Sequence, residues 1–191
     1  MVIGRVLSPV HSLGPGERVC LWTQGCSKKC VGCISPDLQH SHGTIIDNHK
    51  LSQIIIQIGN KCSCTGLTIS GGDPFEQPDD LLELLKLVRG FFDDILVYTG
   101  YTLEEIENGC AGKSGQECLK FIDVLIDGRY EKKLNTRDCV LRGSSNQVIY
   151  YLNKDKEFLY AEYMKEGRIV EHFVHDDKEI VTGILNEEEK Q

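Results

Sequence analysis

The sequence has no long hydrophobic run and no excess of basic residues. Its longest apolar cluster, isoleucines 54, 55, 56 and 58, falls far short of the roughly 20 apolar residues of a membrane span. The N-terminal residues also lack the basic region and apolar stretch of a secretory signal. Acidic residues outnumber basic ones by 29 to 21, whereas proteins that bind nucleic acid usually carry a basic face. We therefore expect a cytoplasmic protein whose partners are neither nucleic acid nor membrane.

Internal repeats and low-complexity linkers are absent too. Apolar residues make up 40% of the 191 residues and charged residues 26%, which is ordinary for a globular protein. A chain of this length corresponds to one domain, with room for an appendage.

Cysteine is the unusual feature. The nine cysteines are about 5% of the chain, below the roughly 8–10% of a disulfide scaffold. Their odd number excludes complete pairing within one chain. In a reducing cytosol such thiols bind metal, carry out chemistry or fill the core.

Strand patterns alternate with helix patterns, which predicts an α/β fold with a mainly parallel sheet. We expect strands at residues 2–7, 18–23, 67–70, 95–98 and 121–126. Helices are expected at residues 48–59 and 78–88, and Thr102 and Glu105 form a capping box that opens a third.

The character of the sequence changes after Asn153. Residues 158–163 and 168–174 flank Lys165-Glu166-Gly167, a pattern that predicts a β-hairpin. The acidic tail, residues 186–191, is expected to fray. We accordingly divide the chain into a core, residues 1–152, and a C-terminal extension, residues 153–191.

Three cysteines follow the second predicted strand at the spacing C-x3-C-x2-C: Cys26, Cys30 and Cys33. Three thiolates can hold three irons of a [4Fe–4S] cluster and leave the fourth iron open, since full ligation takes four cysteines. Zinc is the alternative, with His40 or His42 as a fourth ligand. Plain thiols without a metal are the third interpretation.

Further motifs occur in a fixed order around this loop. They are Gly14-Pro15-Gly16-Glu17-Arg18, Gly25-Cys26, Gly32-Cys33, Ser70-Gly71-Gly72-Asp73-Pro74, Tyr98-Thr99-Gly100-Tyr101, Asp127-Gly128 and Arg142-Gly143-Ser144-Ser145-Asn146-Gln147. Together they resemble the radical S-adenosylmethionine (SAM) superfamily, and within it the activases of anaerobic ribonucleoside-triphosphate reductases. The resemblance covers about residues 1–150.

The resemblance implies an α/β fold, a truncated TIM-like (β/α)6 radical SAM barrel, here with a short C-terminal β-hairpin. It implies a [4Fe–4S] cluster and SAM as cofactors. The enzyme would reductively cleave SAM to a 5′-deoxyadenosyl radical and install a glycyl radical on a partner enzyme. Flavodoxin or ferredoxin would serve as the electron donor.

The resemblance also implies roles for single residues. Cys26, Cys30 and Cys33 would hold the cluster. Gly71, Gly72 and Asp73 would receive the methionine end of SAM, with Asp73 near its ammonium group. The remaining predicted cofactor contacts are Thr99 and Asp127, for the ribose or adenine, and Ser144 and Asn146. From the residues alone, the Gly71-Gly72-Asp73 segment and the positions Thr99 and Asp127 are also compatible with ordinary turns, and the segment with Ser144 and Asn146 with a solvated loop.

Two features depart from the activase pattern: Ile34 replaces the usual aromatic residue after the third cysteine, and the extension has no counterpart. A radical SAM enzyme that modifies a peptide or small molecule, and a non-catalytic zinc-binding module, therefore stay open. The other cysteines are expected to be buried or inert thiols: Cys20, Cys62, Cys64, Cys110, Cys118 and Cys139.

Overall fold

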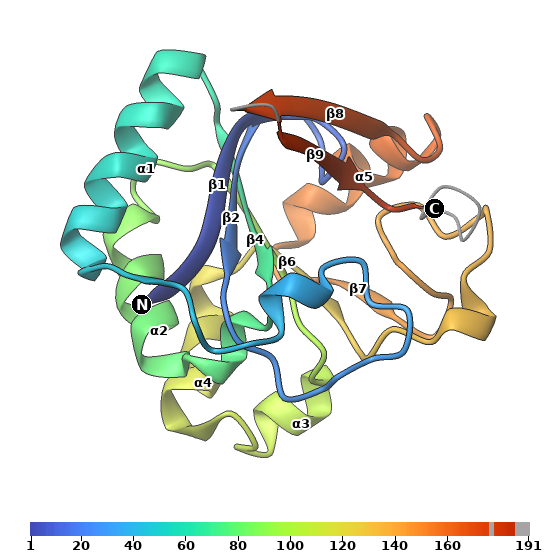
Figure 1. Ribbon diagram of the computed structural model, residues 1–191, viewed down its shortest axis with the longest axis horizontal. Coiled ribbons are helices and arrows are strands. Elements are labelled where there is room, and N and C mark those ends of the chain that lie inside the picture. Colours follow the sequence, from blue (N-terminus) through green and yellow to red (C-terminus); the bar gives the residue numbers. More distant parts are fainter. Residues whose placement is uncertain (176–177, 186–191) are drawn as a thin grey trace.

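A computed structural model describes residues 1–175 and 178–185 of the protein (Figure 1). Seven strands form one sheet. In spatial order they are β3 (Thr44–Ile45), β1 (Val2–Val10), β2 (Arg18–Thr23), β4 (Gly66–Gly71), β5 (Asp94–Tyr98), β6 (Val124–Asp127) and β7 (Val148–Tyr151). The four strands β2, β4, β5 and β6 run parallel, and the outer strands pair antiparallel. The predicted α/β class is confirmed.

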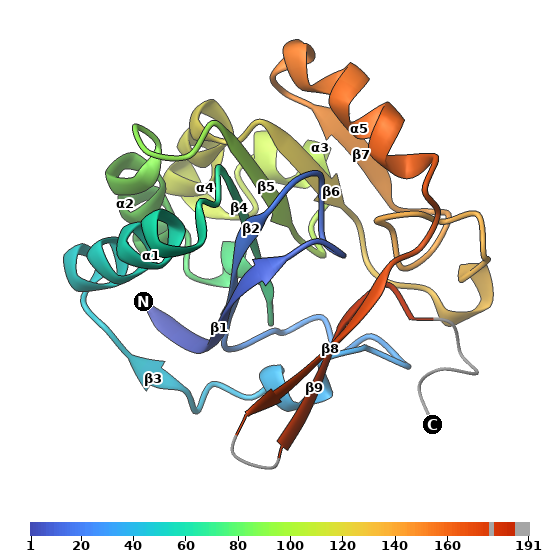
Figure 2. The same cartoon turned by 90° about the horizontal axis from the view of Figure 1, so that it is seen from above.

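The helices α1 (Asn48–Cys62), α2 (Pro78–Val88) and α4 (Gly112–Cys118) gather on one side of the sheet (Figures 1 and 2). Two further helices are α3 (Leu103–Glu107) and α5 (Glu157–Met164). Single-turn 3₁₀ helices lie at Pro36–Leu38 (η1), Pro74–Glu76 (η2), Leu119–Phe121 (η3), Lys132–Leu134 (η4) and Lys154–Lys156 (η5). Among the described residues, no helix has both the length and the apolar character needed to cross a bilayer.

Both faces of the parallel strands are buried. Alternate residues such as Leu67, Ile95 and Val97 face a core shared with α1 and α2. The residues between them, such as Leu96 and Val124, pack with α5 on the opposite face. Burial on both faces explains why these strands read as nearly continuous apolar runs.

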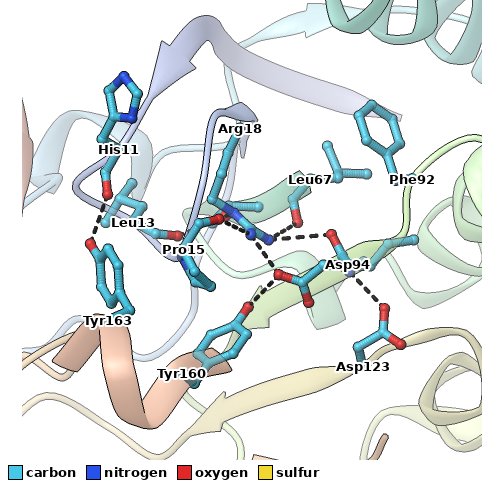
Figure 3. Close-up of polar contacts among 12 residues, drawn as sticks. His11, Leu13, Pro15, Arg18, Leu67, Phe92, Asp94, Asp123, Tyr160 and Tyr163 are labelled. Atoms are coloured by element: carbon cyan, nitrogen blue, oxygen red, sulfur yellow. Dashed lines mark hydrogen bonds and ion pairs between the residues drawn. The ribbon is translucent and has the colours of Figure 1, made fainter. Parts of the chain in front are cut away.

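A buried arginine lies on the second face, at the start of β2 (Figure 3). The Arg18 guanidinium is fully buried, and its Nη1 lies 2.6 Å from Oδ2 of Asp94 on β5. Its other N–H groups reach the carbonyl oxygens of Pro15, Leu67 and Asp94 and the Thr68 hydroxyl. All five donors of the guanidinium therefore have acceptors, as a buried charge requires.

Two glycines make room for this side chain. A Cβ on Gly66 would lie 2.6 Å from Arg18 Nη1, and a Cβ on Gly14 would lie 2.9 Å from Nε. Gly14 also has φ of +130°, a region that other residues avoid. The Gly14-Pro15-Gly16-Glu17-Arg18 motif is thus a packing device that folds its loop onto the guanidinium.

The C-terminal extension differs from the prediction. Residues 158–163 lie in the helix α5, and the hairpin is formed by β8 (Val170–His175) and β9 (Lys178–Gly183). Tyr160 and Tyr163 are buried while Phe158 is 75% exposed, which is the three-residue spacing of a helix rather than strand alternation. Gly167, with φ of +80°, follows the end of this helix instead of forming the hairpin turn. The predicted frayed tail, residues 186–191, lies outside the described residues.

Helix α5 is part of the core. The Tyr160 hydroxyl donates to Oδ2 of Asp94 at 2.9 Å, and the Tyr163 hydroxyl donates to the His11 carbonyl at 2.7 Å (Figure 3). The extension therefore completes the polar cluster around Arg18.

Arg18→Met should lower the free energy of unfolding by about 3–5 kcal/mol, because Asp94 is left buried without its cation. Tyr160→Phe removes a single hydrogen bond to the same carboxylate and should cost about 0.5–1.5 kcal/mol. Arg5→Met breaks the exposed pair with Asp37 and should change stability by less than about 1 kcal/mol. Urea unfolding of the three variants measures this order. Equal losses for Arg18→Met and Arg5→Met would contradict it.

Candidate active site

A cavity opens at the carboxyl ends of the parallel strands, the usual ligand-binding edge of such a sheet. Three segments that follow β2, β4 and β5 line it together. Seven of the predicted site residues are among its lining residues: Cys26, Cys30, Cys33, Gly71, Gly72, Asp73 and Thr99. Sequence motifs from Cys26 to Thr99, 73 positions apart, thus meet around one space.

The cysteine loop is held by backbone contacts to the segment that follows it. Gly25 N–H donates to the Leu38 carbonyl at 2.8 Å, and Cys26 N–H donates to the Gln39 carbonyl at 3.1 Å. Between these ends, Cys33 N–H donates to the Cys30 carbonyl at 3.2 Å. All three cysteines are partly buried and free of disulfides.

Lys28 lies between the first two cysteines, and its side chain connects the cysteine loop to the segment that follows β4. Its Nζ lies 2.9 Å from Oε1 of Glu76 on η2 and 3.8 Å from Oδ2 of Asp73. The same ammonium lies 3.3 Å from the centre of the Tyr101 ring, a cation–π contact. Burial alone would lower the pKa of Lys28, but the hydrogen bond to Glu76 and the charge of Asp73 outweigh it and raise this pKa.

The two glycines at the end of β4 allow the motif to approach the cysteine loop closely. A Cβ on Gly72 would lie 2.2 Å from the Gly25 carbonyl oxygen, and one on Gly71 would lie 2.2 Å from the Thr23 nitrogen. Gly72 N–H also donates to the Thr23 carbonyl, and Asp73 N–H donates to the Gly25 carbonyl. The glycines therefore serve the contact between the two loops as well as lining the cavity.

Asp73 is 1% exposed and links three segments. Its Oδ1 accepts hydrogen bonds from Phe75 N–H and the Thr99 hydroxyl, and its Oδ2 accepts one from Gly100 N–H. Burial raises the pKa of Asp73, while these donors and Lys28 favour the carboxylate. Three of the roughly four acceptor positions of the carboxylate are thus occupied by the protein.

The other predicted residues lie away from the cavity wall. Asp127 accepts from the N–H groups of Leu103 and Val148, and the fully buried Ser144 hydroxyl accepts from Glu131 N–H. Asn146 donates to the Arg129 carbonyl. In the structure these side chains bind nearby backbone, and Asp127 and Asn146 line a neighbouring hollow instead.

Several lining residues were not among the predicted contacts. Gln147 lines the cavity, and its amide binds the backbone of Gly128 and Gly143. It ends the motif that contains Ser144 and Asn146, so the motif itself was the available signal. Residues at the end of the chain also line the cavity: Ile180, Val181, Thr182 and Gly183 of the hairpin, and Ile184 and Leu185 after it. No local sequence pattern predicts that these residues reach the cavity.

The donor set fits an iron–sulfur cluster better than a single ion. Within residues 1–175 and 178–185, no three His, Cys, Asp or Glu side chains converge as ligands of one metal ion. The three cysteines line the cavity, whereas His40 and His42 are not among its lining residues. Three thiols spread around one space suit a larger group that thiolates bind, an iron–sulfur cluster.

Comparisons with known proteins agree with this geometry. The profile of the 4Fe-4S single cluster domain family matches residues 12–150. The chain is 34% identical over 142 residues to the anaerobic ribonucleoside-triphosphate reductase-activating protein of Enterobacteria phage T4, covering 72% of this chain and 85% of that protein.

Bacterial proteins of the same name match similarly. That of Pasteurella multocida is 35% identical over 144 residues, covering 72% of this chain and 89% of the relative. That of Escherichia coli K12 is 32% identical over 146 residues, covering 73% and 91%. The protein therefore belongs to the 4Fe-4S single cluster domain family, within the group of anaerobic ribonucleoside-triphosphate reductase-activating proteins.

Proposed function

We propose that this protein is a radical SAM activase that installs a glycyl radical on an anaerobic ribonucleotide reductase. The main support for this proposal is the cavity at the strand edge. It is lined by all three cysteines of the C-x3-C-x2-C loop and by the Gly71-Gly72-Asp73 segment. The names of the relatives supply the partner class.

Cys26, Cys30 and Cys33 would hold the [4Fe–4S] cluster. When bound, this cluster supplies the electron that cleaves SAM to methionine and a 5′-deoxyadenosyl radical. The protein contributes position and shielding. Lys28 fixes the loop between the first two cysteines through Glu76, and Gly72 keeps that loop against the Gly71-Gly72-Asp73 segment.

Asp73 is suited to receive the ammonium group of SAM. Its carboxylate keeps one acceptor position beyond those used by Phe75, Thr99 and Gly100. An ion pair of this kind in a partly dry cavity is stronger than the same pair in water. Gly71, Gly72 and Thr99 border the same space. Asp127, Ser144 and Asn146 lie outside that lining, and we propose that they act on the cofactor through the backbone that they hold.

The architecture proposed for this activity is a truncated radical SAM barrel formed by the curved sheet. Residues 1–152 would form the catalytic core and residues 153–191 the extension. The reductase would present its glycine at the open side, and flavodoxin or ferredoxin would deliver the electron. We place the reaction in the cytoplasm.

Cys30→Ala should abolish both the broad absorbance near about 400 nm after anaerobic reconstitution and the formation of 5′-deoxyadenosine, because one iron loses its ligand. Cys110→Ala is the matched control, since Cys110 is exposed and outside the cavity lining. It should retain colour and cleavage. A colourless wild-type protein that binds one zinc and leaves SAM intact would refute the proposal that this protein is a radical SAM enzyme.

Asp73→Asn should weaken the binding of SAM by about tenfold or more, since about 1.4 kcal/mol of an ion pair corresponds to that factor. Asp123→Asn is the control, because Asp123 is an equally buried carboxylate that pairs with Arg89 away from the cavity. Equilibrium dialysis of the cluster-loaded proteins measures the two affinities. If both variants lose stability and neither loses affinity, Asp73 has a structural role only.

A further inference from the structure

The extension forms part of the wall of the cysteine cavity. The matched family profile ends at residue 150, yet residues 180–185 line the same cavity as Cys26, Cys30 and Cys33. In Figure 2 the β8–β9 hairpin crosses the side of the sheet opposite α1 and α2. A segment beyond the family match thus borders the space where the chemistry is proposed.

The hairpin is fastened to the β1–β2 connection along one side of the cavity. Glu171 on β8 accepts hydrogen bonds from the N–H groups of His11 and Ser12, at 2.9 and 2.8 Å. The hydroxyls of Ser12 and Thr182 lie 3.0 Å apart and are buried. Phe173 and Ile184 pack against the cluster that contains Trp22.

A second attachment holds the other side. The Asn135 side chain donates to the Leu185 carbonyl at 3.1 Å. Just before the hairpin, Arg168 donates to the Cys139 carbonyl at 3.1 Å and to Oδ1 of Asn135 at 2.8 Å. These contacts hold the base of the hairpin on two sides, so that residues 180–185 keep a fixed place along the cavity.

Two apolar side chains mark the mouth of the cavity. Ile34, directly after the third cysteine, is 46% exposed, and Val181 on β9 is 36% exposed. Both line the cavity. They come from the two places where the sequence departs from the activase pattern, the residue after Cys33 and the extension. Departures that lie far apart in sequence therefore border the same cavity, and both present a partly exposed apolar side chain.

Resting on the proposed function, we propose that Ile34 and the β8–β9 hairpin form a selectivity wall, the surface that decides which glycine-bearing segment reaches the cluster. Its side chains at the cavity are mostly apolar, and the hydroxyl of its one polar member, Thr182, is paired with Ser12. The apolar members are Ile34, Ile180, Val181, Ile184 and Leu185. Such a wall accepts an uncharged segment with apolar side chains beside its glycine, because a charge there would lose water without gaining a partner. The partner is the reductase that this protein activates.

The experiment compares two aspartate substitutions in the same hairpin. Val181→Asp places a charge at the cavity mouth. Val174→Asp places it on β8 at a side chain that is 76% exposed and outside the cavity lining. Both cluster-loaded variants are measured for affinity to the reductase, for glycyl radical by electron paramagnetic resonance, and for SAM cleavage without the reductase.

Val181→Asp should weaken reductase binding by about tenfold or more, with a matching loss of glycyl radical. Its thermal midpoint should stay within a few degrees of the wild type. Its SAM affinity and reductase-free cleavage should stay within about twofold, because the substitution lies outside the cluster loop. Val174→Asp should match the wild type in all readouts. Ile34→Asp, which places the same charge at another exposed apolar residue of the cavity lining, should also weaken reductase binding.

Equal reductase affinity for the two hairpin variants would overturn the selectivity wall. So would a loss confined to SAM affinity, which would make the hairpin a wall for the cofactor alone. Failure of the proposed function has a different signature: the wild-type protein itself would form no glycyl radical on the reductase.

Discussion

The buried guanidinium of Arg18 is the constraint on which the parallel sheet depends. It joins β2 to β4 through the Leu67 carbonyl and the Thr68 hydroxyl, and to β5 through Asp94. A charge without water is tolerable only with every donor satisfied, so these acceptors must stay in place. Arg18 pairs with Gly66, and Gly66 pairs with Asp94, in the strand register. The same register brings Thr23 beside Gly71. The polar cluster around Arg18 lies at one end of these strands. By fixing their register, it also fixes where the two site loops begin at the other end.

Contacts beyond the strand ends also determine the path of each site loop. Gly72 allows contact that a side chain would prevent, with the Gly25 carbonyl 2.2 Å from where its Cβ would lie. Lys28 adds an ionic tether to Glu76 and Asp73. Asp73 in turn binds the segment after β5 through Thr99 and Gly100. Three loops are thus connected by one carboxylate, and the cysteine loop is held by this framework of protein contacts.

Sequence reasoning succeeded where a local pattern decides the structure. The apolar runs and capping residues located five of the seven strands, all except β3 and β7, and the helices α1 to α3. The family resemblance indicated seven residues that line one cavity. Sequence reasoning failed at α5, since the run Phe158-Leu159-Tyr160 has no clear period and only tertiary contacts decide which side chains are buried. Asp127, Ser144 and Asn146 were predicted as cofactor contacts, but their polar atoms bind neighbouring backbone. The residue type alone does not distinguish a polar side chain that stabilises a turn from one that binds a ligand, because both occur at strand ends.

The extension shows how an added segment becomes inseparable from a compact core. Its helix supplies the Tyr160 hydroxyl to the carboxylate that balances Arg18, and its hairpin supplies wall residues near the cysteines. Because hydrogen bonds to a buried charge contribute more than those at the surface, the helix end is the firmer attachment. The hairpin keeps an exposed strand face, with Val174 and Val181 open to solvent. This arrangement lets the residues at the cavity mouth vary while the anchoring tyrosine holds the segment in place, so selectivity at the site can change without disturbing the core.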